Sequence, residues 1–123
     1  MDFEFDDDKP IYKQLVEKIK VEIITGRFKP GDKLPSVREL SSMIHVNPNT
    51  IQRSLTELEN DHLIFTKRTS GKFVTTDQNV IHQIKKELAY EKIDQFIYDM
   101  SNLNIGKQEV IQLLEERKNE SWI

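Results

Sequence analysis

Residues 45–54, HVNPNTIQRS, decide the fold because they place helix-breaking residues between two helical patterns. Asn47 is a favoured helix N-cap, and Pro48 suits the first helical position, where the helix ladder needs no backbone N–H. The stretch therefore ends one helix and at once begins another. In the second of these helices, apolar residues recur at helical spacing and leave polar side chains on the other faces. The expected buried residues are Ile51, Leu55 and Leu58, and the residues expected on the other faces are Asn49, Thr50, Gln52 and Arg53.

The helix upstream of this stretch is predicted to run from Ser36 to about His45. Its first residues, SVRE, have the Ser-x-x-Glu spacing of a capping box, in which the two side chains satisfy free backbone N–H groups. The residues expected on its buried face are Leu40, Met43 and Ile44. Because the next helix begins at Asn47, the two helices are joined by a turn rather than by a linker.

Two further patterns flank this helix-turn-helix. An apolar repeat predicts a first helix from Pro10 to near Gly26. Downstream, IFTKR (64–68) and KFVTT (72–76) are β-prone runs joined by a short turn that contains Gly71, which predicts a two-stranded hairpin. A helix-turn-helix followed by a hairpin is a winged helix, whose recognition helix enters the major groove of DNA.

The C-terminal part of the chain carries apolar residues at helical spacing but is short for a domain of its own. The pattern predicts a long helix at 79–100 and a last helix at 107–118 that buries Val110, Ile111 and Leu114. Two helices of this size cannot enclose a sizeable cavity, so pairing with a second chain is favoured over folding back on the same chain. The residues expected at the dimer contact are Ile84, Leu88, Ile93, Phe96, Ile97, Met100, Ile111 and Leu114.

The predicted fold is thus mostly α-helical with a small β-hairpin. Residues 1–76 are expected to form a winged helix-turn-helix DNA-binding domain. Residues 77–123 are expected to form a short C-terminal two-helix dimerisation region. A homodimer would double the DNA contacts across a two-fold operator.

Composition limits the class of protein. A chain of 123 residues with 37% apolar content holds one compact domain and at most a small appendage. The apolar runs are too short to span a bilayer, and the acidic N-terminus lacks the apolar stretch of a secretory signal. We therefore expect a soluble, cytoplasmic protein that does not contact membranes. Cysteine is absent, which excludes disulfides, thiol catalysis and cysteine metal sites.

Charge is segregated along the chain. The net charge of -3 argues against DNA binding if it is read globally, because phosphate neutralisation supplies most nonspecific affinity. Between Arg27 and Thr75, however, eight Lys and Arg residues stand against five Asp and Glu residues. The acidic excess lies in the remainder, so this middle region is the part suited to face an anion.

The sequence from Gly26 to Val74 resembles the DNA-binding domain of the GntR family. PGDKLPSVREL (30–40) is similar to the family's Pro-Gly-x-x-Leu-Pro-Ser-x-Arg-x-Leu signature. VNPNTIQRSLTELE (46–59) resembles the variant typical of the short YtrA-like subfamily, and KPIYKQL (9–15) also fits. The resemblance implies a dimeric transcriptional regulator, usually a repressor, often of genes for an ABC-type transporter. The inducing effector is unknown, and no cofactor is implied.

The resemblance also indicates DNA-binding residues. It places Arg38 on DNA from the second helix and Gly71 at the tip of the wing. From the recognition helix it places Asn49, Thr50 and Gln52. Side-chain chemistry agrees, because Asn and Gln can bond adenine edges and Arg can bond guanine or phosphate. The full expected set is Ser36, Arg38, Asn47, Asn49, Thr50, Gln52, Arg53, Gly71 and Lys72.

Two departures from the family pattern bear on the wing and on the turn before it. Thr69 stands where many members have a first wing glycine. His62 replaces the glycine that is common after the recognition helix. The depth at which the wing enters the minor groove is therefore left open.

Two other classes of function compete with DNA binding. A winged helix can serve as a protein interaction module that never binds DNA, although the exposed Asn, Gln and Arg residues favour DNA. An enzyme or a metal-dependent sensor would have to rest on His45, His62 and His82, which lack the spacing of metal ligands. No nucleophile turn or oxyanion site is recognisable, so we expect neither catalysis nor a bound metal.

Overall fold

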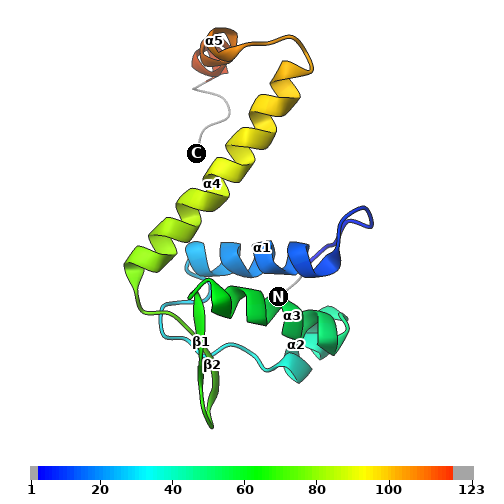
Figure 1. The fold of residues 1–123 in the computed structure, drawn as a ribbon, viewed down its shortest axis with the longest axis vertical. Coiled ribbons are helices and arrows are strands. Elements are labelled where there is room, and N and C mark those ends of the chain that lie inside the picture. The colour runs from blue at the N-terminus through cyan, green and yellow to red at the C-terminus, as the bar shows by residue number, and fades with distance from the viewer. Residues whose placement is uncertain (1–2, 118–123) are drawn as a thin grey trace. The chain divides into compact units, whose positions relative to one another are not determined.

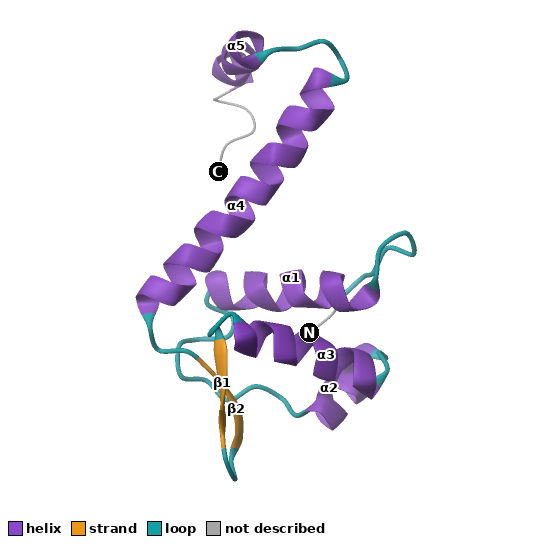
Figure 2. Cartoon of the chain, in the orientation of Figure 1, coloured by secondary structure: helices purple, strands orange, loops and turns teal. Residues whose placement is uncertain are grey.

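The structure is a computed structural model that describes residues 3–117 of the chain. Its elements in chain order are α1 (Ile11–Ile24), α2 (Val37–Ile44), α3 (Pro48–Asn60), β1 (Ile64–Lys67), β2 (Gly71–Val74), α4 (Gln78–Ser101) and α5 (Lys107–Arg117). Figures 1 and 2 show the hairpin following the three N-terminal helices. The predicted fold class, mostly helical with one small hairpin in winged-helix order, is confirmed. The chain divides into two compact units between Lys85 and Lys86.

Side-chain caps set the boundaries of α2 and α3. Ser36 and Glu39 form the predicted capping box: the Ser36 hydroxyl accepts from the Glu39 N–H at 3.1 Å, and the Glu39 carboxylate accepts from the Ser36 N–H at 3.0 Å. α2 ends at His45, whose φ of 57° is left-handed and stops the helix. The Asn47 side chain then accepts from the Asn49 N–H at 2.8 Å. The predicted break between the two helices is confirmed.

The core of the first unit lies where α1 and α2 pack against α3. Ile51, Leu55 and Leu58 of α3 are fully buried, as the helical spacing predicted. Each such side chain stabilises the fold by about 1.5–3 kcal/mol through its removal from water. Ser54 lies on the same buried face, and its hydroxyl donates to the Tyr12 carbonyl oxygen at 3.0 Å. A hydrogen bond therefore reinforces the packing of α1 on α3.

The buried face of α2 is narrower than predicted. Leu40 and Ile44 are buried, but Met43 is 46% exposed, so the expectation that Met43 joins the core is wrong. The reason is geometric: α2 is an eight-residue helix that packs against α3 along one stripe. Leu40 and Ile44, four residues apart, share that stripe, whereas Met43 is turned toward solvent.

The hairpin pairs β1 and β2 in antiparallel register, with Phe65 opposite Phe73 and Thr66 opposite Lys72. The segment that precedes α2 pairs with β2 beside the hairpin, because the Leu34 N–H donates to the Lys72 carbonyl oxygen at 2.9 Å. Side chains alternate between the two faces of a strand. Phe65 and Phe73 accordingly stack on one face with 5.9 Å between ring centroids, and Thr66 and Lys72 lie together on the other. The wing has one aromatic face and one polar face.

His62 connects α3 to β1 in a backbone conformation that favours glycine. Its φ is 62°, which is left-handed and costs a residue with a Cβ roughly 1–2 kcal/mol. This is the position at which the resembling proteins commonly carry glycine. Histidine therefore adopts the same left-handed conformation as glycine would, and the chain still turns from α3 into the wing.

α4 begins inside the first unit. The Asp77 carboxylate caps it by accepting from the Asn79 N–H at 2.9 Å. Ile81 and Ile84 belong to the hydrophobic core cluster of the winged helix. The first unit therefore includes the first turns of α4 and ends at Lys85.

The second unit consists of the rest of α4 and of α5. The helices predicted at 79–100 and 107–118 agree with α4 and α5, except that Lys118 lies outside the described residues. The described residues of α5 include none that is buried, so the expected burial of Val110, Ile111 and Leu114 is not met within one chain. A unit of this size has too few side chains to cover its own apolar surface.

Candidate nucleic-acid interface

The outer side of α3 carries polar residues that were predicted to contact DNA. Asn49 and Gln52 are exposed, and Thr50 is half-buried. The Gln52 amide nitrogen donates to the Thr56 hydroxyl at 3.3 Å, which orders the amide along its own helix. The amide oxygen and the second N–H stay available. They are the groups with which glutamine forms paired hydrogen bonds to an adenine edge.

Arg53 lies on α3 but is ordered by α1. Its guanidinium carbon lies 3.6 Å from the ring centroid of Tyr12. The adjacent Ser54 hydroxyl, bonded to the Tyr12 carbonyl oxygen, fixes the two helices at this point. Stacking uses the flat face of the guanidinium and leaves its N–H donors, which lie in the plane, able to bind an anion. The arrangement suits a phosphate contact at the edge of the α3 surface.

Two of the predicted DNA-binding residues, Ser36 and Asn47, serve as helix caps. Each uses a side-chain oxygen to accept a backbone N–H from the helix that it starts. The Ser36 hydroxyl proton and the Asn47 side-chain N–H groups are not used in these caps. Both residues can therefore support a helix and donate to a phosphate.

Arg38 lies on the exposed side of α2, close to the start of α3. It lines a shallow depression of about 560 Å³ together with Val37, Ser41, Ser42 and Pro48. Within residues 3–117 its guanidinium has no hydrogen-bond or ion-pair partner. Arg38 is therefore a cation available to an anion beside the helix-turn-helix.

The wing presents further cations near its turn. Lys67 and Arg68 are exposed at the end of β1, and the Lys67 ammonium lies 4.5 Å from the ring centroid of Phe73. Gly71 follows the turn as the first residue of β2, with a φ of 111°, and a Cβ there would lie 3.1 Å from the Lys33 side chain. The backbone conformation favours glycine at this position, whereas the Lys33 side chain could shift to make room for a Cβ.

Lys72 differs from these cations because its ammonium group is already paired. Its Nζ lies 2.9 Å from a Glu59 carboxylate oxygen and 2.9 Å from the Thr66 hydroxyl, which itself donates to the other Glu59 oxygen at 2.8 Å. The hydrogen bonds from Lys72 and then from Thr66 hold the pKa of the Glu59 carboxyl below its ordinary value. Sequence reasoning missed Glu59. The available signal was an acidic residue near the end of a helix that was expected to face DNA.

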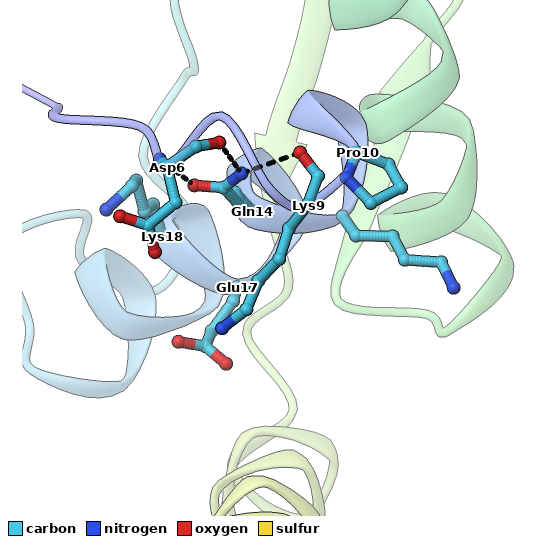
Figure 3. Close-up of a pocket in the computed structure, with 7 residues that line it drawn as sticks. Asp6, Lys9, Pro10, Gln14, Glu17 and Lys18 are labelled. Atoms are coloured by element: carbon cyan, nitrogen blue, oxygen red, sulfur yellow. Dashed lines mark hydrogen bonds between the residues drawn. The ribbon is translucent and has the colours of Figure 1, made fainter.

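Sequence reasoning also missed how the N-terminal arm, residues 3–9, is fastened to α1. Figure 3 shows the Gln14 amide bonded to the arm: its oxygen accepts from the Asp6 N–H at 2.7 Å, and its nitrogen donates to the carbonyl oxygens of Asp6 and Lys9 at 2.8 and 2.9 Å. A depression of about 420 Å³ at this junction is lined by Asp6, Lys9, Pro10, Lys13, Gln14, Glu17 and Lys18. The Gln14 amide is thus used to hold the chain that enters α1.

Neither a metal site nor a membrane span is found in the part of the chain that the structure describes. No group of three or more His, Cys, Asp or Glu side chains in that part could hold a metal ion. His45 and His62 lie in turns between elements, and His82 is exposed on α4. None of the helices between residues 3 and 117 is long and apolar enough to cross a membrane.

The residues predicted at a dimer contact fall into two groups. Ile84 packs in the core of the first unit, and Leu88 is also buried, whereas Met100 is half-buried. The others are open to solvent in the single chain: Ile93 48%, Phe96 39%, Ile97 55%, Ile111 45% and Leu114 47%. This unit has further exposed apolar or aromatic residues that are not among the expected dimer contacts, namely Tyr90, Tyr98, Leu103 and Leu113. Several large apolar side chains exposed in one short unit favour association with another apolar surface.

The winged-helix region matches a known family of regulators. Residues 11–74 match the family model described as bacterial regulatory proteins, gntR family. The chain is 37% identical over 112 residues to the uncharacterized HTH-type transcriptional regulator YhcF of Bacillus subtilis, an alignment that covers 91% of this chain and 93% of that protein. It is 33% identical over 108 residues to the HTH-type transcriptional repressor YtrA of Bacillus subtilis, covering 87% of this chain and 83% of that protein.

Solved structures extend these similarities. A GntR family transcriptional regulator from Listeria monocytogenes is 46% identical, with a TM-score of 0.83, and the match covers 91% of this chain and 98% of that one. AraR(DBD) in complex with operator ORX1 is 25% identical, with a TM-score of 0.54 over 61% of this chain and 95% of that one. A related fold has thus been seen on operator DNA.

Proposed function

The chain belongs to the gntR family of bacterial regulatory proteins, and from this membership we propose that it is a transcriptional repressor that binds a two-fold operator as a homodimer. The observation that carries the proposal is the start of α3. A side-chain cap begins this helix and leaves Asn49, Gln52 and Arg53 exposed. Such polar groups are suited to the edges of bases and to phosphates.

The residues of the helix-turn-helix divide by role in this proposal. Asn49 and Gln52 read base edges, because their carboxamides can form paired hydrogen bonds. Arg53 and Arg38 bind phosphate from the two sides of the recognition helix. Asn47 contributes chiefly by starting that helix in the correct place.

The remaining proposed contacts are auxiliary. Thr50 and Ser36 donate their hydroxyl protons to phosphates, which positions the protein without reading sequence. Gly71 acts through the backbone of the wing, whose cations near the turn are Lys67 and Arg68. These contacts would add affinity for all DNA sequences alike.

The homodimer rests on the second unit. Its exposed apolar side chains include Ile93, Phe96 and Ile97 on α4 and Ile111 and Leu114 on α5. Burial of these side chains against the same surface of a second copy would remove them from water and create a two-fold axis. We therefore assign DNA binding to residues 1–76 and dimerisation to residues 77–123. The first turns of α4 also pack in the winged-helix core.

The repressor role and its target follow from the relatives. YtrA of Bacillus subtilis is named a repressor, and this chain is similar to it over most of both lengths. We assign the same role here. By the resemblance to the YtrA-like subfamily, the regulated genes would encode a transporter, and the protein would act in the cytoplasm without catalysing a reaction.

A mobility-shift experiment tests DNA binding. The probes are a duplex recovered by selection from a random pool and a scrambled duplex of the same composition. The proposal expects the selected duplex to be shifted at protein concentrations that leave the scrambled duplex unbound. If neither duplex were retarded at low salt, the chain would instead be a winged-helix interaction module.

A further inference from the structure

Glu59 joins the recognition helix to the wing. It lies in the last turn of α3, and its carboxylate accepts from Lys72 at 2.9 Å and from Thr66 at 2.8 Å. Thr66 and Lys72 are opposite each other in the hairpin register, one on each strand. A single carboxylate therefore holds both strands of the wing against the end of the helix.

The same contacts leave Lys72 with its charge already matched. The Lys72 side chain is 21% exposed and the Glu59 side chain is 37% exposed, so the pair lies at the surface but is partly shielded from water. The Lys72 ammonium also donates to the Thr66 hydroxyl at 2.9 Å. The Lys72 ammonium keeps one of its three N–H donors, but a phosphate that took it would lie beside the negatively charged Glu59 carboxylate and would be repelled. Fuller pairing of Lys72 with a phosphate would require breaking its contacts with Glu59 and Thr66.

Within residues 3–117, the other cations of the wing have no carboxylate that competes for them. Arg68 is exposed at the turn, and Lys67 is exposed with its ammonium over the Phe73 ring, a contact that leaves its charge unmatched. Lys67 and Arg68 are therefore open to a phosphate near the turn of the wing, whereas Lys72 is held by Glu59.

We propose that Glu59 is a positioning residue for DNA binding, which keeps Lys72 paired in the DNA complex and so presents the wing to DNA through the cations at its turn. This inference rests on the proposed function. It changes the role of Lys72 from a phosphate contact to part of the joint between the wing and α3.

The slope of log affinity against log salt concentration tests this, because each phosphate neutralised by a cation adds about 0.9 to the slope. Wild type, Lys72→Met, Glu59→Gln and the double variant are titrated with the selected duplex over a salt series. We expect Lys72→Met to leave the slope nearly unchanged. Glu59→Gln should steepen it by about 1, since the released lysine can reach a phosphate, and the double variant should return to the wild-type slope.

The scrambled duplex adds a second readout. A released Lys72 binds any phosphate, so Glu59→Gln should strengthen binding to the scrambled duplex, and we expect the preference for the selected duplex to fall by about threefold. Glu57→Gln is the matched control, because it removes the same charge from the same helix at a carboxylate without a partner within residues 3–117. We expect it to leave the effect of Lys72→Met unchanged.

Each outcome supports or overturns the inference. If Lys72→Met alone lowered the slope by about 1, Lys72 would contact phosphate in the wild-type complex and the inference would be overturned. It would also be overturned if Glu59→Gln steepened the slope to the same extent with and without Lys72. The Lys72→Met result shows whether Lys72 contacts phosphate even if Glu59→Gln fails to fold. A wild-type protein that bound no duplex would refute the proposed function instead.

Discussion

The two units of this chain use apolar residues in opposite ways. In the winged helix, Leu15, Ile51 and Leu55 are fully buried within a single chain. In the second unit, Ile97 of α4 is more than half exposed, although α4 is a continuous helix of 24 residues. The difference teaches that helical periodicity indicates which face of a helix is apolar, and that tertiary packing decides whether the same chain covers it.

The largest expected effect comes from making the same substitution in both units. Leu55→Ala should reduce the free energy of unfolding by about 2–5 kcal/mol, because it leaves a cavity in the core. Leu103→Ala should change it by less than about 0.5 kcal/mol, because Leu103 is 64% exposed. Urea unfolding of both variants, at a concentration at which the protein is monomeric, checks this. Similar losses for the two would remove the contrast between the units.

A second substitution tests what the exposed surface of the second unit is for. Ile97→Asp should weaken self-association by about 1.5–3 kcal/mol, since it replaces an apolar contact by a charge, and should leave the winged helix folded. Sedimentation equilibrium measures the change, with Asp94→Asn as an exposed polar control on the same helix. A wild-type protein that stayed monomeric at all concentrations would contradict the role assigned to this surface.

A third variant concerns the helix start inside the first unit. Asn47→Ala should cost about 0.5–2 kcal/mol of stability, because the Asn49 N–H loses its side-chain acceptor. Asn49→Ala should leave stability nearly unchanged. Thermal melts of the two variants give the comparison, and equal destabilisation would mean that the cap is not what starts α3.

The smallest expected effect is a loss of stability at acidic pH, and it is also confined to the first unit. Hydrogen bonds from Ser36 lower the pKa of Glu39, and those from Lys72 lower the pKa of Glu59, both from an ordinary value of 4.5. The unfolded chain then takes up protons at higher pH than the folded chain. The stability supplied by these carboxylates is therefore present above about pH 4.5 and is lost as pH falls through the lowered values.

Variants at the two carboxylates test whether stability falls with pH in this way. Glu39→Gln and Glu59→Gln should each be less stable than wild type near neutral pH and should show a flatter fall in melting temperature below about pH 5. Melting curves that ran parallel to wild type down to about pH 3 would mean that these hydrogen bonds do not favour the ionised forms.

Local signals in the sequence were enough to predict the fold. The caps at Ser36 and Asn47, and the β-prone runs around Gly71, act through bonds within a few residues, so the sequence alone carries them. Met43 was misplaced because helical spacing does not specify how wide a stripe the neighbouring helix covers. That width depends on tertiary contacts.

Less of the candidate site could be predicted from the sequence. The exposed side of α3 follows from periodicity, but the pairing of Glu59 with Lys72 joins residues on different elements, and the stacking of Arg53 on Tyr12 joins α3 to α1. Such contacts depend on the packed fold. The sequence therefore identified Lys72 as a cation without revealing that its charge is already matched.

The central claim is that the exposed carboxamides of α3 read sequence while the cap before them only positions the helix. The most direct test is the ratio of affinities for the selected duplex and for its single-base variants, measured for wild type, for Asn47→Ala and for the double variant Asn49→Ala, Gln52→Ala. We predict that the double variant loses about 1–3 kcal/mol of discrimination at a contacted base, whereas Asn47→Ala weakens all duplexes alike. A double variant that kept the wild-type ratio, beside an Asn47→Ala protein that lost it, would contradict the account.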